Sequence, residues 1–145
     1  MDNFNLNRYV VKFGYDNMDF VKVTKMLSTA YWSKDIKIKE VKKGASNSAL
    51  LTGIFNNNEQ IGYARVISDK TRFAYILDVF VDEDYRKKGI GQLMINSILS
   101  NKDLKDVYQW VLITRDAHGV YSKSGFKELN NPQNWMEIRN ERPSR

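Results

Sequence analysis

Apolar residues recur along this chain at two spacings, every second position and every third or fourth position, which predict strands and helices respectively. Asp and Asn residues at the start of the first helical stretch can cap it. A polar turn at 56–59 separates two apolar stretches and predicts a hairpin. The predicted elements are, in chain order, a strand at 8–13, helices at 17–27 and 38–44, strands at 49–55, 60–67 and 73–81, a helix at 91–100, a strand at 107–114, a helix at 117–124 and a closing strand at 135–139.

The second half of the chain has the order expected of a mixed α/β domain. Strand 73–81 is central, and helix 91–100 follows it after a short basic turn. Strand 107–114 is largely apolar, as a parallel strand covered on both faces should be. The helix at 91–100 is expected to bury one apolar face, made of Leu93, Met94, Ile98 and Leu99.

The turn between strand 73–81 and helix 91–100 predicts an anion site. Gly89 and Gly91 allow a close backbone approach, and the unpaired N–H groups of the helix's first turn point into the same concavity. Three cations add positive charge beside these glycines: Arg86, Lys87 and Lys88.

Two short sequence motifs restrict the identity of this anion. Gly89-Ile90-Gly91 is followed by Gln92, which fits neither the nucleotide P-loop nor the dinucleotide fingerprint. The remaining pattern, R-x-x-G-x-G after Val-x-Val at residues 79–81, resembles the pyrophosphate loop of the GNAT superfamily of acetyl-CoA-dependent N-acetyltransferases. Only the proline often seen where Glu83 stands is missing. Residues 117–126 resemble the family's fourth helix, A-x-x-L-Y-x-K-x-G-F.

The resemblance implies the GNAT fold, in which the central strands splay apart to admit the pantetheine arm, and direct acetyl transfer from acetyl-CoA to an amine without a metal. It implies that the main chain of Val79, Phe80 and Val81 bonds the pantetheine amides and the thioester oxygen, in the manner of an oxyanion hole. It also implies that Tyr121 is the general acid toward the departing sulfur, although a half-buried packing role beside Phe126 would suit the same residue. The residues expected around the pyrophosphate are Arg86, Lys87, Lys88, Gly89, Ile90, Gly91 and Gln92.

Two positions depart from the family pattern. Thr114 stands seven residues before Tyr121, where relatives often have an Asn that contacts pantetheine, so at most one hydroxyl bond to the donor remains. Gln109 stands where some relatives place a glutamate base, and a glutamine cannot accept a proton. The base must therefore come from elsewhere in the chain.

Asp78 is the only charged residue within the strand at 73–81. A carboxylate in such a strand is costly unless it is paired or faces a polar cleft. It could hold the acceptor's ammonium or relay its proton through water, or it could form a structural ion pair with an arginine. The candidate arginines are Arg65, Arg72 and Arg115, and the aromatic residues that could wall an acceptor pocket are Tyr31, Trp32 and Tyr63.

Composition restricts the remaining possibilities. With 145 residues, 42% of them hydrophobic, residues 1–145 form a single domain. The absence of Cys excludes disulfides and a Cys nucleophile, and a single histidine, His118, argues against a metal site. The N-terminal residues 1–7 lack the features of a signal peptide, and no apolar run could span a membrane, so we expect a cytoplasmic protein.

The partners that fit this composition are a polyanionic donor and an amine. Lys and Arg exceed Asp and Glu by six, which suits coenzyme A but would also suit nucleic acid. We do not expect nucleic acid, because the basic residues form no stripe with interleaved aromatics, and the lysine-rich run at 34–43 has the pattern of a solvated helix face. The expected acceptor is a small-molecule or peptide amine, homodimerisation is possible, and a GNAT fold that binds CoA without transferring acetyl is the alternative.

Overall fold

The computed structural model of the chain describes residues 8–142 and 144; the N-terminal stretch at 1–7, used above for the localisation argument, lies outside the described residues, as do 143 and 145. Five strands form one sheet in the order β1-β2-β3-β4-β5, with every neighbouring pair antiparallel except the parallel pair β4–β5. The mixed α/β class is therefore confirmed. The strands are β1 (Val10–Phe13), β2 (Leu50–Asn56), β3 (Glu59–Ser68), β4 (Phe73–Val81) and β5 (Gln109–Val111).

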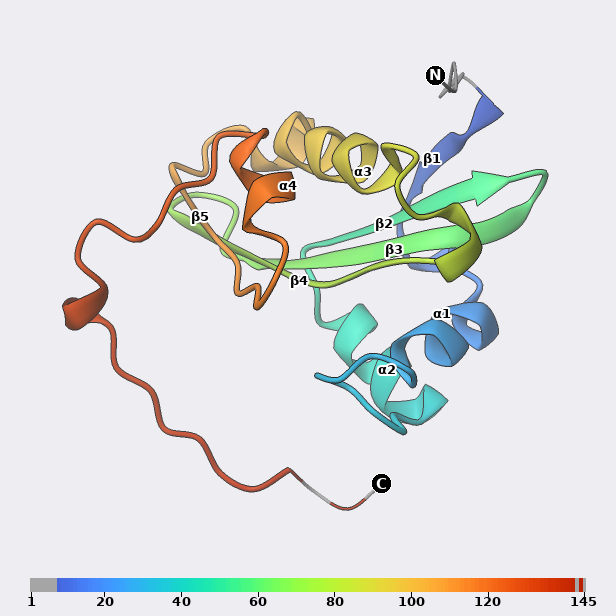
Figure 1. Cartoon of the computed structure of the whole chain (residues 1–145), viewed down its shortest axis with the longest axis horizontal. Helices are drawn as coiled ribbons and strands as arrows, with labels where there is room; N and C mark the ends of the chain where they lie inside the picture. The colour runs from blue at the N-terminus through green and yellow to red at the C-terminus, as the bar shows by residue number, and fades with distance from the viewer. Residues whose placement is uncertain (1–7, 143, 145) are drawn as a thin grey trace.

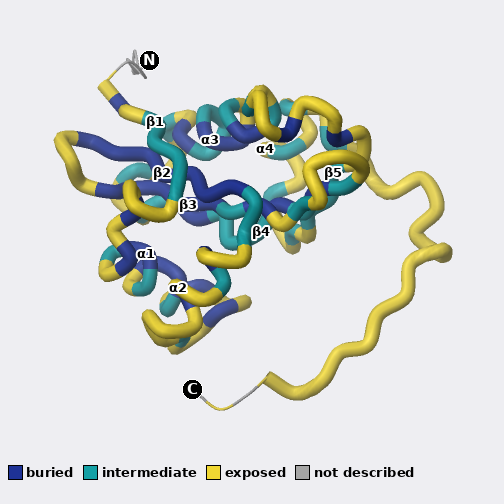
Figure 2. Tube along the Cα trace, turned by 180° about the vertical axis from the view of Figure 1, so that it is seen from behind, coloured by how far each residue is buried: buried dark blue, intermediate teal, exposed yellow. Residues whose placement is uncertain are grey.

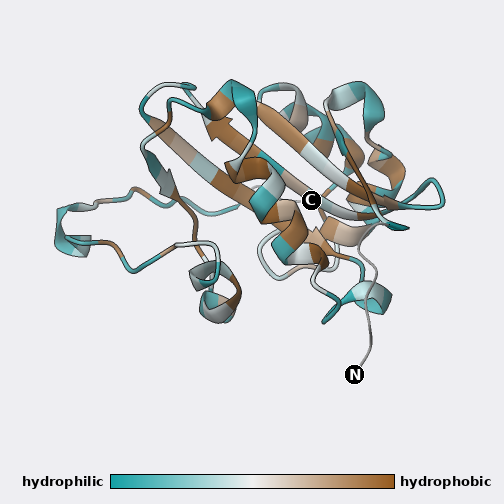
Figure 3. Cartoon of the chain, turned by 90° about the horizontal axis from the view of Figure 1, so that it is seen from above, coloured by the Kyte–Doolittle hydropathy of each residue, from teal (hydrophilic) through white to brown (hydrophobic). Residues whose placement is uncertain are grey.

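Among the described residues, four α-helices cover the two faces of this sheet (Figure 1). They are α1 (Phe20–Leu27), α2 (Ile38–Ser46), α3 (Ile90–Leu99) and α4 (His118–Ser122). α1 and α2 lie on one face, where their apolar residues pack with Leu51, Tyr63 and Phe80, and α3 and α4 lie on the other. Figure 3 shows the hydrophobic residues concentrated along the strands and the helices that cover them. The sheet is thus enclosed between two cores.

Local sequence signals account for several of these elements. The Asp19 side chain accepts a hydrogen bond from the backbone N–H of Lys22 and caps α1, as the sequence predicts. The 56–59 turn joins β2 and β3 in an antiparallel pair. In α3 the buried face is Ile90, Met94, Ile95 and Ile98, whereas Leu93 and Leu99, which we expected to be buried, are only partly so.

Two predictions about the end of the sheet are wrong. The strand predicted at 107–114 is parallel to β4, as expected, but it is only three residues long, Gln109–Val111, and these residues are exposed or half-buried instead of being covered on both faces. The closing strand predicted at 135–139 is absent: those residues have no regular secondary structure and are exposed. A strand needs a hydrogen-bonding neighbour, and within the described residues this segment has none.

The pairing of β4 creates the feature that matters for function. β4 pairs with β5 only from Phe73 to Tyr75, so the rest of β4 has no neighbouring strand on that side. On its other side the register with β3 shifts between Tyr63 and Arg65, so that Asp78 and Val79 together lie opposite the single residue Ala64. This is a β-bulge. The expected splaying of the central strands is therefore confirmed.

Candidate active site

The open edge of β4 is the centre of the candidate site. Val79 and Val81 are partly buried and Phe80 is buried on the α1–α2 side, so these side chains pack within the domain. Asp78 has a positive φ of 54°, a conformation that Asp and Asn tolerate better than most residues. Within the described residues no strand pairs with the β5 side of β4 beyond Tyr75, so main-chain polar groups of the Val79–Val81 segment on that side can bond a ligand in place of a strand.

The basic turn leads directly from this edge into α3. Gly89 has φ 81° and ψ 5°, and it forms the N-cap of α3 without a side-chain cap. The first-turn N–H groups of α3 are therefore available to an anion. A side chain added at Gly91 would meet only Val81, with its Cβ at 3.9 Å from Cγ2, so the main chain there is open to close approach.

The cations of the turn differ in their surroundings. The Arg86 Nε donates to the carbonyl of Val81 at 3.0 Å, and its guanidinium lies 5.0 Å from the centre of the Phe80 ring. Arg86 thus fastens the turn to the end of β4. Lys88 lies 5.5 Å from the Tyr85 ring, and Lys87 is exposed with φ 62°. Lys87 and Lys88 therefore add positive charge next to the start of α3.

The side chain of Gln92 joins α3 to the turn that follows α4. Its Nε2 donates to the hydroxyl of Ser124, and that hydroxyl in turn donates to Asn96 Oδ1 at 2.9 Å. The sequence singled out Gln92 for a role at the pyrophosphate, but in the structure its side chain has a structural partner. Its backbone N–H remains in the first turn of α3, so any contact with an anion would come from the main chain.

Tyr121 lies on α4, across the gap from the α1–α2 loop. Burial and the nearby phenol of Tyr31 raise its pKa above the ordinary value, so that it keeps its proton at neutral pH. Its ring packs edge-on to Phe126 at a centroid distance of 6.1 Å, and the guanidinium of Arg115 lies 3.8 Å from the centre of the Tyr31 ring. Tyr121 is therefore a partly buried, protonated phenol on α4.

Thr114 and Gln109 contribute little to the candidate site. The Thr114 hydroxyl accepts a hydrogen bond from the backbone N–H of Ala117 at 3.0 Å, just before α4, which leaves it one proton to donate elsewhere. Gln109 is exposed at the start of β5, and His118 is exposed at the start of α4.

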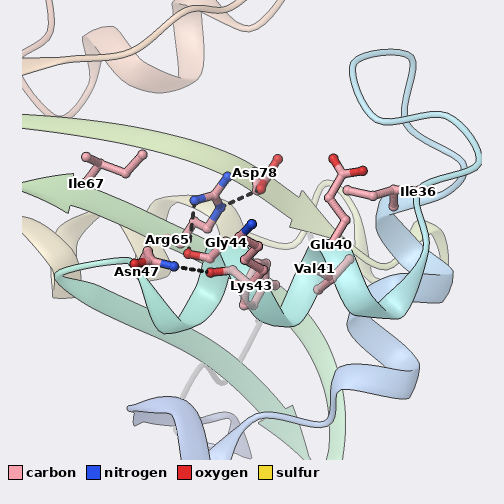
Figure 4. Close-up of a pocket in the computed structure, with 10 residues that line it drawn as sticks. Ile36, Glu40, Val41, Lys43, Gly44, Asn47, Arg65, Ile67 and Asp78 are labelled. Carbon is pink, nitrogen blue, oxygen red and sulfur yellow. Dashed lines mark hydrogen bonds and ion pairs between the residues drawn. The ribbon is translucent and has the colours of Figure 1, made fainter. Parts of the chain in front are cut away.

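Asp78 points to the opposite side of β4, into a cavity of about 310 Å³ between α2 and the sheet (Figure 4). One carboxylate oxygen accepts from Arg65 Nε at 2.7 Å, and the other accepts from Trp32 Nε1 at 3.0 Å. Both partners of the ion pair are largely buried, with 12% of the Asp78 side chain and 18% of the Arg65 side chain exposed. Of the three candidate arginines, Arg65 is the one that pairs with Asp78.

Residues from α2 complete the cavity. Arg65 Nη1 also donates to the carbonyl of Gly44 and to the hydroxyl of Ser48, both at 3.3 Å, so the guanidinium connects β3, β4 and α2. Figure 4 shows Glu40 and Lys43 on the α2 side of the same cavity. The cavity therefore carries charges of both signs.

Tyr63 forms part of the cavity lining on β3. Its hydroxyl is buried without a hydrogen-bond partner among the described residues, and this burial raises its pKa. Tyr31 packs edge-on to Trp32, with 5.1 Å between ring centroids. The three aromatic residues that the sequence analysis proposed as walls thus lie around Asp78 and the gap.

Sequence reasoning missed the contribution of α2. The 34–43 run has the pattern of a solvated face, and most of it is exposed, but Glu40 and Lys43 also face the cavity. It also missed Trp32 as a donor to Asp78, because that contact joins residues 46 positions apart.

The arrangement contains no group of three His, Cys, Asp or Glu residues suited to a metal ion within the part of the chain that is described. Over the same residues, no helix has the length and apolar character needed to cross a bilayer.

Comparison with known proteins identifies the family. The sequence model of the acetyltransferase (GNAT) domain matches residues 48–128, more than half of the chain. Among curated proteins, the uncharacterized N-acetyltransferase ycf52 of Pyropia yezoensis is 24% identical over 115 residues, and its counterpart in Porphyra purpurea is 23% identical. The match covers 76% of this chain and only 66% of either relative.

Solved structures agree with this family. A protein of Xanthomonas campestris described as a GNAT-family acetyltransferase is 32% identical, with a TM-score of 0.86 over 91% of this chain and 93% of that protein. Protein SA2161 of Staphylococcus aureus, described as a probable acetyltransferase of unknown function, is 25% identical, with a TM-score of 0.71 over 90% and 100% of the two chains. The fold is also that of a Clostridium acetobutylicum protein solved with acetyl-CoA, which is 16% identical with a TM-score of 0.69 over 90% and 96%. By its sequence, its fold and the splayed strands at its centre, this chain belongs to the GNAT acetyltransferase family.

Proposed function

We propose that this protein transfers the acetyl group of acetyl-CoA to a primary amine of a small molecule or peptide by direct attack. The observation that carries the proposal is the open edge of β4 at Val79–Val81, which lies between the uncapped start of α3 and the protonated phenol of Tyr121. These three features are the binding surface for an extended amide chain, the site for a pyrophosphate and the acid for a thiolate.

The donor would be held mainly by main-chain groups. The start of α3 takes the pyrophosphate, with Lys87 and Lys88 adding charge and Gly91 leaving room for close approach. The bulged segment Val79–Val81 takes the pantetheine amides along its open edge, and Thr114 has one hydroxyl proton left to donate. Arg86 holds the turn in shape through Val81 and Phe80.

Acetyl-CoA supplies an activated thioester, and the residues of the chain supply its polarisation and a proton. A main-chain N–H of the bulge bonds the thioester oxygen and stabilises the negative charge that develops there when the amine attacks the carbonyl carbon. The carbon–sulfur bond then breaks, and Tyr121 donates its proton to the departing sulfur. Because the pKa of Tyr121 is raised, the phenol keeps this proton at neutral pH until the carbon–sulfur bond breaks. The attacking nitrogen loses a proton to water to give the neutral amide, and the phenolate left on Tyr121 takes up a proton from water.

The acceptor would enter from the cavity on the α2 side. Asp78 lies next to the proposed acyl-binding segment and provides a carboxylate for an ammonium group. Both of its oxygens already accept hydrogen bonds, from Arg65 and Trp32, so an ammonium group would be a further hydrogen-bond donor to the carboxylate. A carboxylate can accept more than one hydrogen bond at each oxygen, so Asp78 can hold the amine and pass its proton to water.

A panel of primary amines, assayed with acetyl-CoA by detection of the released thiol, tests this proposal. We expect turnover with at least one amine and its loss in Tyr121→Phe. Calorimetry with CoA separates the alternatives: binding without turnover of any amine would favour a CoA-binding module, and no binding would exclude both. Binding to nucleic acid that weakens steeply with salt concentration would instead favour the alternative that this is a nucleic-acid-binding domain.

A further inference from the structure

The cavity beside α2 contains basic side chains as well as the carboxylate proposed to hold the amine. Its acidic residues are Asp78 of β4 and Glu40 of α2, and its basic residues are Arg65 of β3 and Lys43 of α2. Figure 4 shows the side chains of Glu40 and Lys43 extending from α2 into the same cavity as the Asp78 carboxylate. A ligand with a charge of only one sign would therefore meet like charges in this cavity.

Arg65 has hydrogen-bonding capacity that its protein partners leave unused. Its Nε donates to Asp78, and its Nη1 donates to Gly44 and to Ser48, whereas Nη2 has no partner among the described residues. The donors of a guanidinium are fixed in one plane, and Nη2 lies on the same edge as Nε. The unused N–H groups of Arg65 therefore lie next to the carboxylate of Asp78, on a side chain that is 18% exposed.

A glycine of α2 gives this guanidinium its room. A Cβ added at Gly44 would lie 3.2 Å from Arg65 Cζ, 3.3 Å from Nη1 and 3.4 Å from Nη2. Glycine in the interior of a helix is destabilising, so its presence within α2 needs a reason. The close approach of the guanidinium supplies that reason, and it fixes the unused edge of Arg65 between α2 and Asp78.

Two further donors border the cavity. Lys43 lies on the exposed part of α2, whose other residues are buried against the domain (Figure 2), and its amino group has no partner within the described part of the chain. Tyr63 is fully buried, and its hydroxyl also lacks a partner there. This hydroxyl is close enough to Arg65 and Asp78 for their charges to act on its pKa. A buried hydroxyl without a partner is costly, and a polar ligand in the cavity would offer one.

We propose that the acceptor is an amine that carries a carboxylate next to its amino group, as a free amino acid does; this proposal rests on the proposed function. The ammonium pairs with Asp78, and the carboxylate is bound by Arg65 Nη2 and Lys43. Such a molecule places each of its charges beside an opposite one. The amino group then adjoins the proposed acyl-binding segment Val79–Val81, where it is acetylated. A cavity of about 310 Å³ is at the small end of ligand sites, which suits a free amino acid.

Pairs of acceptors that differ only in charge test this class. With acetyl-CoA as donor, we expect at least one standard L-amino acid to exceed its own α-carboxamide in kcat/KM by roughly tenfold or more, because hydrogen bonds to a charged group are strong. The carboxamide has the same shape, and its amine is less basic and so more often neutral. A preference for the acid therefore reports binding of the carboxylate. Equal or faster turnover of the carboxamides, or of peptides that begin with the same residue, would overturn the proposal.

A variant of α2 tests the residue assignment. Lys43→Gln should raise KM for the preferred amino acid by roughly fivefold or more and reduce its advantage over the carboxamide, since the lysine contributes a charge-assisted hydrogen bond. Lys42→Gln removes the neighbouring exposed charge of α2, which does not line the cavity, and should alter neither quantity. Equal effects of Lys43→Gln on the acid and on the carboxamide would refute the role of Lys43 in binding the carboxylate.

Calorimetry with the L-amino acids in the presence of CoA separates this proposal from the proposed function. An amino acid that binds more tightly than its carboxamide but is never acetylated would support the cavity and contradict acetyl transfer. Acetylation of simple amines with no preference for amino acids would support transfer and refute the cavity. If no amino acid binds or reacts, the proposed acceptor class is wrong, whatever other amine is acetylated.

Discussion

Replacing Asp78 by Asn is the sharpest test of the acceptor side of the site. The substitution removes the negative charge and keeps the shape of the side chain. It also suits the backbone, because Asn tolerates the positive φ of 54° at this position. The amide oxygen can still accept from Trp32 Nε1 or from Arg65 Nε, but the ion pair is lost.

The cost to stability follows from the burial of that pair. Removing one partner of a buried ion pair costs about 3–5 kcal/mol, because the other charge stays buried without compensation. Here Arg65 keeps its hydrogen bonds to Gly44 and Ser48, and 18% of its side chain is exposed to water. The loss in the free energy of unfolding should therefore lie near the lower end of that range. At about 2–4 °C for each kcal/mol, the midpoint of thermal unfolding should fall by several degrees.

Thermal unfolding and steady-state kinetics, measured on the same preparation below its melting range, separate the two roles of Asp78. If Asp78 holds the acceptor, KM for a cationic amine rises or kcat falls, while CoA affinity stays within a few-fold because the main-chain contacts are untouched. Asp106→Asn makes the same chemical change at an exposed site and should alter neither measurement. Lower stability with unchanged kinetics would make Asp78 purely structural, and unchanged stability with unchanged kinetics would refute both roles.

Three further predictions address the donor site and the stability of the fold. Gly91→Val should weaken acetyl-CoA binding at least tenfold in calorimetry, about 1.4 kcal/mol, because the space outside Gly91 is where the pyrophosphate is proposed to approach; equal affinity would move that site elsewhere. Tyr121→Phe should lower kcat by about 10²–10⁴-fold while CoA affinity is retained, and a variant that keeps most of its kcat would make the tyrosine structural. The hydrogen bond from Lys22 lowers the pKa of Asp82, so the stability from this pair is complete above the unfolded pKa of about 3.9 and is lost as pH falls through the lower folded pKa. Urea unfolding of Lys22→Met should therefore show lower stability at neutral pH and a smaller loss on acidification, and a pH profile parallel to that of the wild type would contradict this role.

Local signals in the sequence were sufficient for most of the fold. The cap at Asp19, the polar turn at 56–59 and the glycines before α3 act over a few residues, and each predicted its element. The basic turn predicts an anion site at the start of α3, and that site stays a prediction. The edges of the sheet were harder to predict, because an apolar stretch such as 107–114 has the same pattern whether or not a neighbouring strand pairs with its full length.

The contacts around Asp78 depend on long-range geometry. The sequence showed that its carboxylate needed a partner and offered three arginines, but only the β3–β4 register decides that Arg65 is the neighbour. The bulge itself has no local signature here, since no glycine marks it. Trp32 reaches Asp78 from a loop whose path depends on the packing of α1 and α2.

The bulge at Asp78 also explains how one strand can serve two substrates in the proposed reaction. The extra residue lets β4 turn the Asp78 carboxylate into the cavity beside α2, where Arg65 and Trp32 hold it. Immediately afterwards, the backbone of Val79–Val81 has β3 on one side and, within the described residues, no strand on the other. An amine held at Asp78 and a thioester held at Val79–Val81 would therefore lie at neighbouring positions of the same strand. Deletion of Val79 would leave Asp78 alone opposite Ala64, remove the bulge and make the pairing of β4 with β3 regular, so the backbone beyond Asp78 would lose its present course. Binding of the donor and of the acceptor should then be lost together, whereas Gly91→Val should affect the donor alone.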